Sequence, residues 1–285
     1  MSGQIYIGCT GWGDHDSLYE GGTTPAQKLS VYASHFPSVE LDASFYAVPS
    51  EQQVAKWIRE TPETFRFVVK AYQGMTGHMR GENPFPSKKA MYDAFDLAVK
   101  PMQDQGKLAM VLFQFPPWFD VKKEHVSLIK GIRERYDHYD LALEFRHRSW
   151  FESTYREKTL ALMKEGRWIH SICDEPQAGE KSVPFVPVAT TGHRTLIRLH
   201  GRNVAGWNYP AKGDEWRDVR YLYDYSEDEL KTLAKHVKAI HAQSSEVYVI
   251  FNNNSGGHAA ANAERLKEIL GISYDGLNPA QLKLF

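Results

Sequence analysis

The stretch Leu108-Ala109-Met110-Val111-Leu112-Phe113-Gln114 is a short apolar run that ends in an amide side chain. An apolar run of this length without alternation is typical of a strand that is buried on both faces of a parallel sheet. Seven further runs of the same kind occur along the chain, at residues 5–9, 38–42, 65–70, 141–145, 168–173, 195–200 and 247–251. The sequence therefore predicts eight buried strands.

Longer amphipathic segments separate the predicted strands. Helical patterns occupy residues 25–35, 50–60, 87–105, 123–136, 152–165, 226–243 and 259–270. The crossover at 175–192 contains three prolines and two glycines, so we expect an irregular loop with at most one short helical turn there. Eight strands alternating with these helices in 285 residues predict the α/β class and one (β/α)₈ TIM-like barrel over residues 1–278.

A doubly wound sheet is the alternative fold. It normally contains fewer strands, and the G-x-G-x-x-G pattern of dinucleotide-binding folds does not follow the first predicted strand. The barrel is therefore the favoured interpretation.

The composition limits the classes of function. Lys and Arg total 34 and Asp and Glu total 35, which gives a net charge of -1. Any site for a polyanion must therefore be a local patch, because no global positive field exists. The apolar runs are too short to span a bilayer and no signal-like segment opens the chain, so we expect a cytoplasmic protein without a membrane partner.

Polar side chains stand at the end of nearly every predicted strand. They are Glu40, Asp42, Lys70, Gln114, Glu144, Arg146, His147, Asp174, Arg198, His200, Asn252 and Asn253. In a barrel the carboxyl ends of the strands meet on one face, which is where ligands bind. The set favours a functional site at that face. The alternative is a layer of polar residues that satisfy one another inside the barrel.

The ionisable members of this set suggest acid–base chemistry. Glu40, Asp42, Glu144 and Asp174 are candidate acids, bases or metal ligands, and Lys70 and His200 are candidate catalytic partners. This spread is compatible with a divalent metal, although the sequence contains no closed zinc motif. A metal-free site built on Lys70, Arg146 and Arg198 is equally compatible.

A second pattern at the predicted barrel mouth indicates phosphate binding. The segment from Asn252 through Gly256 and Gly257 leads directly into a predicted helix, whose first amides favour an anion. Barrels often hold phosphate after the seventh and eighth strands. The candidate phosphate-binding residues are Gln114, Arg146, His147, Arg198, Asn252, Asn253, Gly256 and Gly257. An ordinary capped turn is the alternative interpretation.

Two insertions follow predicted strands and could cover the mouth of the barrel. Residues 72–86 follow the third strand and residues 202–225 follow the seventh. The second insertion interleaves aromatic and basic side chains, namely Trp207, Tyr209, Trp216, Tyr221 and Tyr223 with Lys212, Arg217 and Arg220. Such interleaving is typical of surfaces on which bases stack and phosphates are bound.

Motifs along the whole chain resemble the domain-of-unknown-function 72 family, the YecE-like proteins. They are Gly8-Cys9-Thr10-Gly11-Trp12, Val39-Glu40-Leu41-Asp42-Ala43-Ser44-Phe45-Tyr46, Phe67-Val68-Val69-Lys70-Ala71, Leu112-Phe113-Gln114-Phe115-Pro116-Pro117, Glu144-Phe145-Arg146-His147, Arg198-Leu199-His200-Gly201 and Phe251-Asn252-Asn253. The resemblance implies a TIM-barrel-like fold and carries no settled activity. Two departures stand out, because Gly77 separates Thr76 from His78 and Asp42 replaces the frequent Asn.

The chain ends in a tail, residues 279–285, that contains Gln281, Leu282, Leu284 and Phe285. This pattern resembles the peptide by which bacterial repair and replication proteins bind the DNA sliding clamp. An exposed apolar end is costly in water unless a groove receives it. The alternative is that the tail packs on the bottom of the barrel.

Together these patterns predict an enzyme that acts on a phosphate-containing substrate. One hypothesis is a clamp-tethered DNA-repair nuclease or hydrolase that uses a divalent metal and is similar in layout to endonuclease IV barrels. A second is an isomerase or hydrolase of a sugar phosphate, using the same carboxylates as acid and base. A third is a non-enzymatic module that binds nucleic acid or the clamp.

Overall fold

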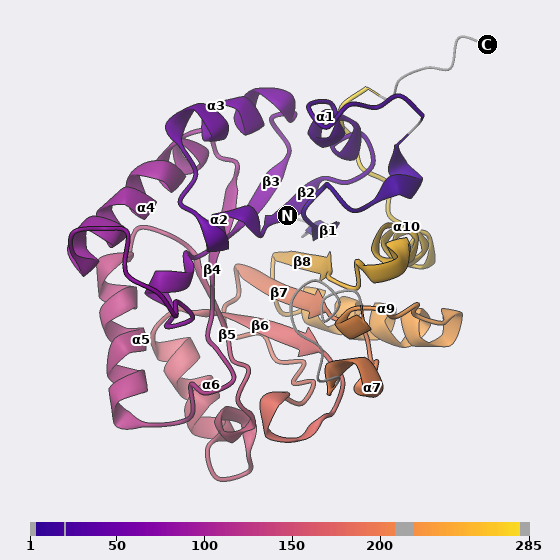
Figure 1. The fold of residues 1–285 in the computed structure, drawn as a ribbon. Coiled ribbons are helices and arrows are strands. Elements are labelled where there is room, and N and C mark those ends of the chain that lie inside the picture. Colours follow the sequence, from indigo (N-terminus) through magenta and orange to yellow (C-terminus); the bar gives the residue numbers. More distant parts are fainter. Residues whose placement is uncertain (1–3, 20, 209–218, 280–285) are drawn as a thin grey trace.

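Eight parallel strands form a closed barrel in the computed structural model, which describes residues 4–19, 21–208 and 219–279. The strands are β1 (Gln4–Thr10), β2 (Ser38–Leu41), β3 (Arg66–Lys70), β4 (Leu108–Gln114), β5 (Leu141–Glu144), β6 (Ile169–Asp174), β7 (Arg194–Leu199) and β8 (Glu246–Phe251). Each pairs with its neighbours in sequence, and β1 pairs with β8 to close the sheet (Figure 1). The predicted TIM-like barrel is confirmed.

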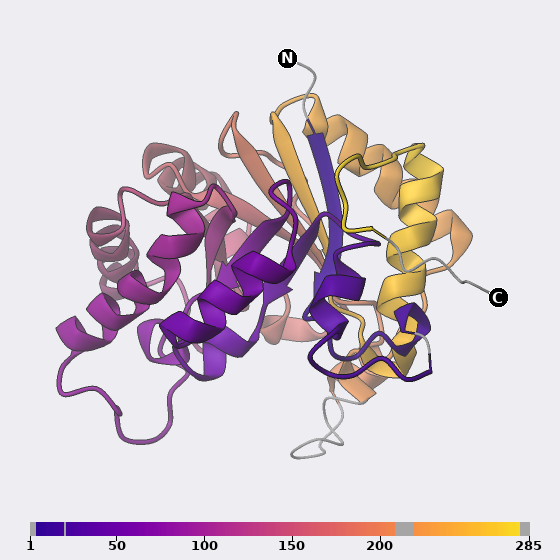
Figure 2. The same cartoon turned by 90° about the horizontal axis from the view of Figure 1, so that it is seen from above.

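Helices cover the outside of the barrel (Figure 2). They are α1 (Lys28–Tyr32), α2 (Ala43–Tyr46), α3 (Glu51–Glu60), α4 (Lys88–Asp104), α5 (Lys123–Arg135), α6 (Arg156–Glu165), α7 (Val204–Trp207), α9 (Glu227–His241) and α10 (His258–Leu270). Capping boxes at Ser50 and Ser226 satisfy the first amides of α3 and α9. In the described ranges no helix is long and apolar enough to cross a bilayer.

The helix predictions differ from the structure in three respects. The segment predicted at 152–165 is an α-helix only from Arg156, where α6 begins. The segment predicted at 25–35 is helical only in α1, because Thr24 binds the side chain of Gln27 and forms a turn before the helix. The four-residue helices α2 and α7 were not predicted, since an element this short shows no periodicity. The sixth crossover contains one 3-10 turn, Gly179–Lys181, and is otherwise irregular as expected.

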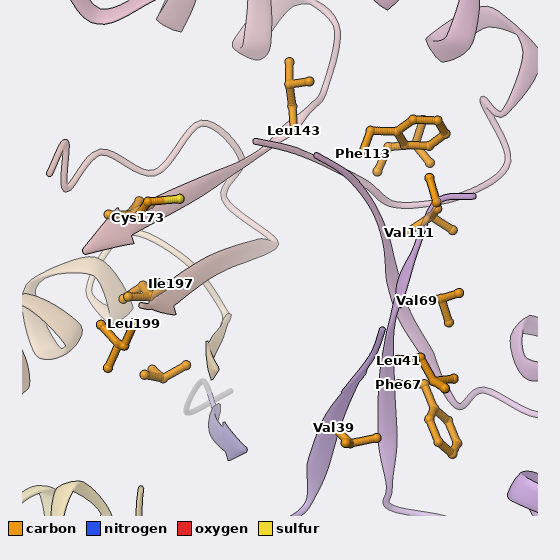
Figure 3. Close-up of a cluster of buried hydrophobic side chains, with 14 of the residues drawn as sticks. Val39, Leu41, Phe67, Val69, Val111, Phe113, Leu143, Cys173, Ile197 and Leu199 are labelled. Atoms are coloured by element: carbon orange, nitrogen blue, oxygen red, sulfur yellow. The ribbon is translucent and has the colours of Figure 1, made fainter. Parts of the chain in front are cut away.

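Alternation along the strands divides the buried side chains into two layers. One layer lies between the sheet and the helices and includes Val39, Val69 and Leu143 (Figure 3). The other fills the barrel and includes Val68 and Leu112. A TIM barrel is therefore a packed core and not a pore. Towards the carboxyl ends of the strands this inner layer becomes polar.

The inner layer is tight where β1 meets β2, and we predict that Gly8→Ala is destabilising. A Cβ at Gly8 would lie 2.1 Å from the backbone oxygen of Ser38, so the strands would have to separate. Forced overpacking of this kind costs about 1–3 kcal/mol of unfolding free energy. Denaturant unfolding measures this loss.

The matched control is Gly131→Ala in α5, where a Cβ meets nothing within 4 Å. Alanine favours a helix over glycine by about 1 kcal/mol, so the control is expected to be stabilised. Equal stability of the Gly8→Ala variant and the wild-type protein would contradict the packing argument.

Candidate functional site

Arg198 is fully buried at the centre of the polar layer, between two glutamates from opposite sides of the barrel. Its Nε donates to Glu40 Oε2 at 2.7 Å, and its Nη1 donates to Glu144 Oε2 at 2.8 Å. Its Nη2 donates to the second oxygen of Glu40. Because buried charges are stable only when they are paired and hydrogen-bonded, the three side chains form one unit.

Arg146 extends this cluster towards the sixth crossover. Its Nη1 donates to Glu175 Oε2 at 2.5 Å, and its Nε lies 2.7 Å from Glu144 Oε1 without the alignment of a hydrogen bond. The other oxygen of Glu175 accepts the amide N–H of Val183 at 2.6 Å. Glu175 therefore ties the irregular crossover to the barrel.

The hydrogen bonds of His200 determine its protonation. Its Nε2 lies 3.0 Å from Arg146 Nη2, and a guanidinium can only donate, so Nε2 is an acceptor. The proton of the neutral ring then resides on Nδ1, which lies 2.8 Å from the amide of Asn252. The nearer amide atom is Nδ2, and because two N–H donors cannot bond each other, we infer that the Asn252 amide is turned so that its oxygen accepts that proton. Burial, followed by Arg146 and Arg198, lowers the pKa of His200 well below its usual value.

The buried arginines also change the pKa values of the neighbouring carboxylates. Burial opposes ionisation of Glu144, but Arg146 and Arg198 outweigh it and lower its pKa to about 2. Burial raises the pKa of Glu175 to about 7 despite the opposing effect of Arg146. Glu144 is thus a permanent anion, whereas Glu175 titrates near neutrality.

A cleft of about 1250 Å³ lies above the buried cluster, at the carboxyl ends of the strands. Of the predicted site residues, the cleft is lined by Asp42, Lys70, Gln114, Arg146, Asn252, Gly256 and Gly257. Lys70 Nζ donates to Asp42 Oδ1 at 3.0 Å on its wall. These positions come from β2, β3, β4, β5 and β8, so the strand-end residues do meet on one face.

The remaining predicted site residues lie beneath the cleft or beside it. Glu40, Glu144, Arg198 and His200 belong to the buried cluster. Asp174 binds Arg202 and Tyr225 instead. His147 binds Ser149, and Asn253 donates to the backbone of Tyr223. The predicted tail residues Gln281, Leu282, Leu284 and Phe285 lie outside the described part of the chain, as do Tyr209, Lys212, Trp216 and Arg217.

Several cleft residues were not included in the predicted site. They are Phe45, Tyr46, His78, Arg80, Trp118, Arg220 and Tyr221. Four of these, His78, Arg80, Arg220 and Tyr221, belong to the two insertions, whose position after strands was the available signal. Arg220 stacks on Trp207, with 3.6 Å between the guanidinium carbon and the ring centre. His78 bonds Thr76 Oγ1 at 2.9 Å, and burial with Lys70 and Arg146 lowers its pKa to about 4.

The start of α10 forms another part of the cleft wall. Gly256 and Gly257 both have left-handed backbone conformations, with φ of 74° and 75°. No side chain caps α10, and both glycines line the cleft. Uncapped amides at the start of a thirteen-residue helix favour an anion.

The carboxylates of the buried cluster do not fit a divalent metal. Glu144, Cys173 and His200 place one ligand atom each within 4.8 Å of one another. However, Glu144 already accepts hydrogen bonds from Arg198 and Ser171, and Nε2 of His200 faces Arg146. A cation there would have to displace guanidinium groups. Asp42 and Asp174 are likewise paired with Lys70 and Arg202.

We predict that Arg198→Met strongly destabilises the protein. The substitution leaves Glu40 and Glu144 buried without their main partner, which costs about 3–5 kcal/mol of unfolding free energy. The control Arg265→Met removes a guanidinium that also contacts two glutamates, but at the surface. We expect little change there, because exposed ion pairs contribute little. Similar denaturation midpoints for the two variants would refute the central role of Arg198.

Comparison with known proteins identifies relatives over the whole chain. The family model described as "Protein of unknown function DUF72" matches residues 6–283. The UPF0759 protein YunF of Bacillus subtilis is 56% identical over 281 residues, covering 99% of this chain and 100% of the relative. The UPF0759 protein YecE of Escherichia coli K12 is 25% identical over 217 residues, covering 69% of this chain and 74% of YecE.

Two solved structures have the same architecture. A DUF72 family protein from Enterococcus faecalis matches with a TM-score of 0.90 and 38% identity, covering 98% of this chain and 100% of that one. A DUF72 family protein from Thermotoga maritima matches with a TM-score of 0.80 and 32% identity, covering 94% of this chain and 99% of that one. On this evidence the chain belongs to the DUF72 family.

Proposed function

We propose that the cleft at the mouth of the barrel binds a phosphate-bearing substrate. The observation that carries the proposal is the convergence of four cationic side chains on one cleft, those of Lys70, Arg80, Arg146 and Arg220. The uncapped start of α10 adds backbone amides to the same wall. Guanidinium groups and helix amides are the groups that proteins use to bind phosphate.

The charges on the cleft wall are not all compensated locally. The acidic lining residues are Asp14, Asp16 and Asp42, of which Asp42 is paired with Lys70 and Asp16 with Lys28. Arg80 packs over Trp118, and among the residues that the structure describes no carboxylate pairs with it. A net charge of -1 for the chain is therefore compatible with a local anion site.

The groups that line this cleft and can exchange a proton include Asp14, Asp16, Asp42, Lys70 and His78. The buried glutamates do not belong to this set, because Arg198 and Arg146 hold them beneath the cleft. Metal-dependent hydrolysis by Glu40 and Glu144 is accordingly not part of the proposal. The buried cluster instead provides a rigid floor on which Arg146 is oriented towards the ligand.

Nucleic acid is a second candidate, favoured by the aromatic side chains of the cleft. Tyr46 and Trp118 are 53% and 54% exposed, and Arg80 lies beside Trp118. Exposed rings next to guanidinium groups are suited to stacking bases while the phosphates are bound. This candidate includes the clamp-tethered repair hypothesis. The alternative of a small sugar phosphate leaves much of a 1250 Å³ cleft empty.

We predict that methyl phosphate binds the wild-type protein and that Arg80→Gln weakens its binding about tenfold, as expected for the loss of one charge-assisted hydrogen bond. Calorimetric titration measures the change. The control is Arg59→Gln, an exposed position on α3 away from the cleft. Oligothymidylate is titrated in parallel to test the nucleic-acid candidate. Absence of methyl phosphate binding, or equal binding by both variants, would reject the phosphate site.

The sliding-clamp hypothesis has a separate test. Asn278 fixes the chain just before the tail, since its side chain donates to the backbone oxygens of Ser30 and Glu60. We predict micromolar binding of a bacterial sliding clamp to the full chain, lost in a Leu284→Ala/Phe285→Ala variant. Calorimetric titration of the clamp into the wild-type protein and into the variant measures this binding. If neither binds, the tail has no role in clamp recruitment.

A further inference from the structure

A second depression lies between the α2–α3 segment and α4. Its volume is about 450 Å³. Its lining residues, which we call the apolar groove, are Tyr46, Ala47, Val48, Pro49, Glu51, Tyr72, Pro84, Phe85, Ala94, Leu97 and Ala98. Glu51 is the one charged member of this set. Leu97 is 75% exposed on α4 and adds apolar surface to the groove wall.

The apolar groove and the cleft are adjacent and share one lining residue. Tyr46 lines both, and its ring is half exposed at the junction. The segment 72–86 also contributes to both walls. Its residues His78 and Arg80 face the cleft, whereas Tyr72 and Phe85 face the groove. The groove therefore begins beside the cleft, with the half-exposed Tyr46 between them.

The chemistry of the two parts differs sharply. On the cleft side, Lys70 lies near Tyr46, because its Nζ is 4.7 Å from the centre of the Phe45 ring, which packs edge-on against Tyr46. Arg80 lines the same cleft. The groove presents aliphatic and aromatic carbon, and the hydroxyl of Tyr72 is already directed at the sulfur of Met79. The polar edge of a nucleobase would find few hydrogen-bonding partners there. A hydrocarbon chain needs none, and its burial is favourable.

We propose that the natural ligand is amphipathic, with an anionic phosphate head in the cleft and a hydrocarbon chain in the apolar groove. This inference rests on the proposed phosphate site and names the class of its substrate. The two parts are bridged at Tyr46, so head and chain belong to one molecule. The groove is a subsite of the cleft in this arrangement.

The test is a homologous series of methyl, butyl, hexyl and octyl phosphate, titrated into the full-length protein below their aggregation concentrations. Each methylene that enters the groove is expected to tighten binding about two- to fourfold, up to the length that fills it. Octanol, which lacks the phosphate, is expected to bind more weakly than octyl phosphate. Affinities that do not change along the series would overturn the proposal.

Leu97→Asp places a charge on the groove wall at an exposed position, where the fold is expected to tolerate it. We expect it to abolish the dependence on chain length and to leave methyl phosphate binding unchanged. The matched control is Leu128→Asp on α5, a leucine that is 40% exposed and does not line either site. The control should retain the dependence on chain length.

The outcomes separate the two proposals. If methyl phosphate fails to bind, the phosphate site itself is wrong. If methyl phosphate binds and the longer chains bind no better, the cleft remains a phosphate site and the amphipathic ligand is rejected. Sedimentation of the wild-type and Leu97→Asp proteins tests whether a second copy of the chain occupies the groove. A dimer that dissociates on this substitution would assign the groove to a second copy of the chain and overturn the proposal.

Discussion

The bonding of Arg198 to Glu40 and Glu144 is the constraint on which the mouth of the barrel depends. Its guanidinium joins β7 to β2 and β5 across the interior, where it is shielded from bulk solvent. Glu144 in turn contacts Arg146, and Arg146 contacts Glu175 and His200. A buried ion pair is weak evidence for stability in general. Here it fixes the side chains under the cleft in one arrangement.

The barrel could be predicted from the sequence because each strand is an uninterrupted apolar run, and the predicted and observed strands differ by only a residue or so at their ends. The convergence of strand-end side chains followed from the same topology. The division of these side chains into a buried cluster and a cleft wall did not follow from the topology. It depends on which side chains can reach a partner across the barrel, and Arg198 is long enough to reach Glu40, which is 158 residues away in sequence. Glu175 also lies in an irregular segment, where no period reveals an inward-facing residue.

The cleft thus combines two kinds of support. Its floor is built from strand residues that are held by charge pairing, and this part does not change without loss of stability. Its walls include the segments after β3 and β7, which carry Arg80 and Arg220, together with the start of α10. Because loops do not hold the core together, we expect substitutions in these segments to cost less stability than substitutions in the floor.

The packed interior of the barrel limits how a molecule can enter and leave the cleft. Below the polar layer the interior is filled by side chains such as Met110 and Leu196, and Tyr6 and Tyr248 stack with 4.6 Å between ring centres. A molecule in the cleft has no route through the barrel to the opposite end. Any ligand of the cleft must therefore arrive and depart through the same opening. Exchange of one bound molecule for another accordingly takes place at the mouth of the barrel.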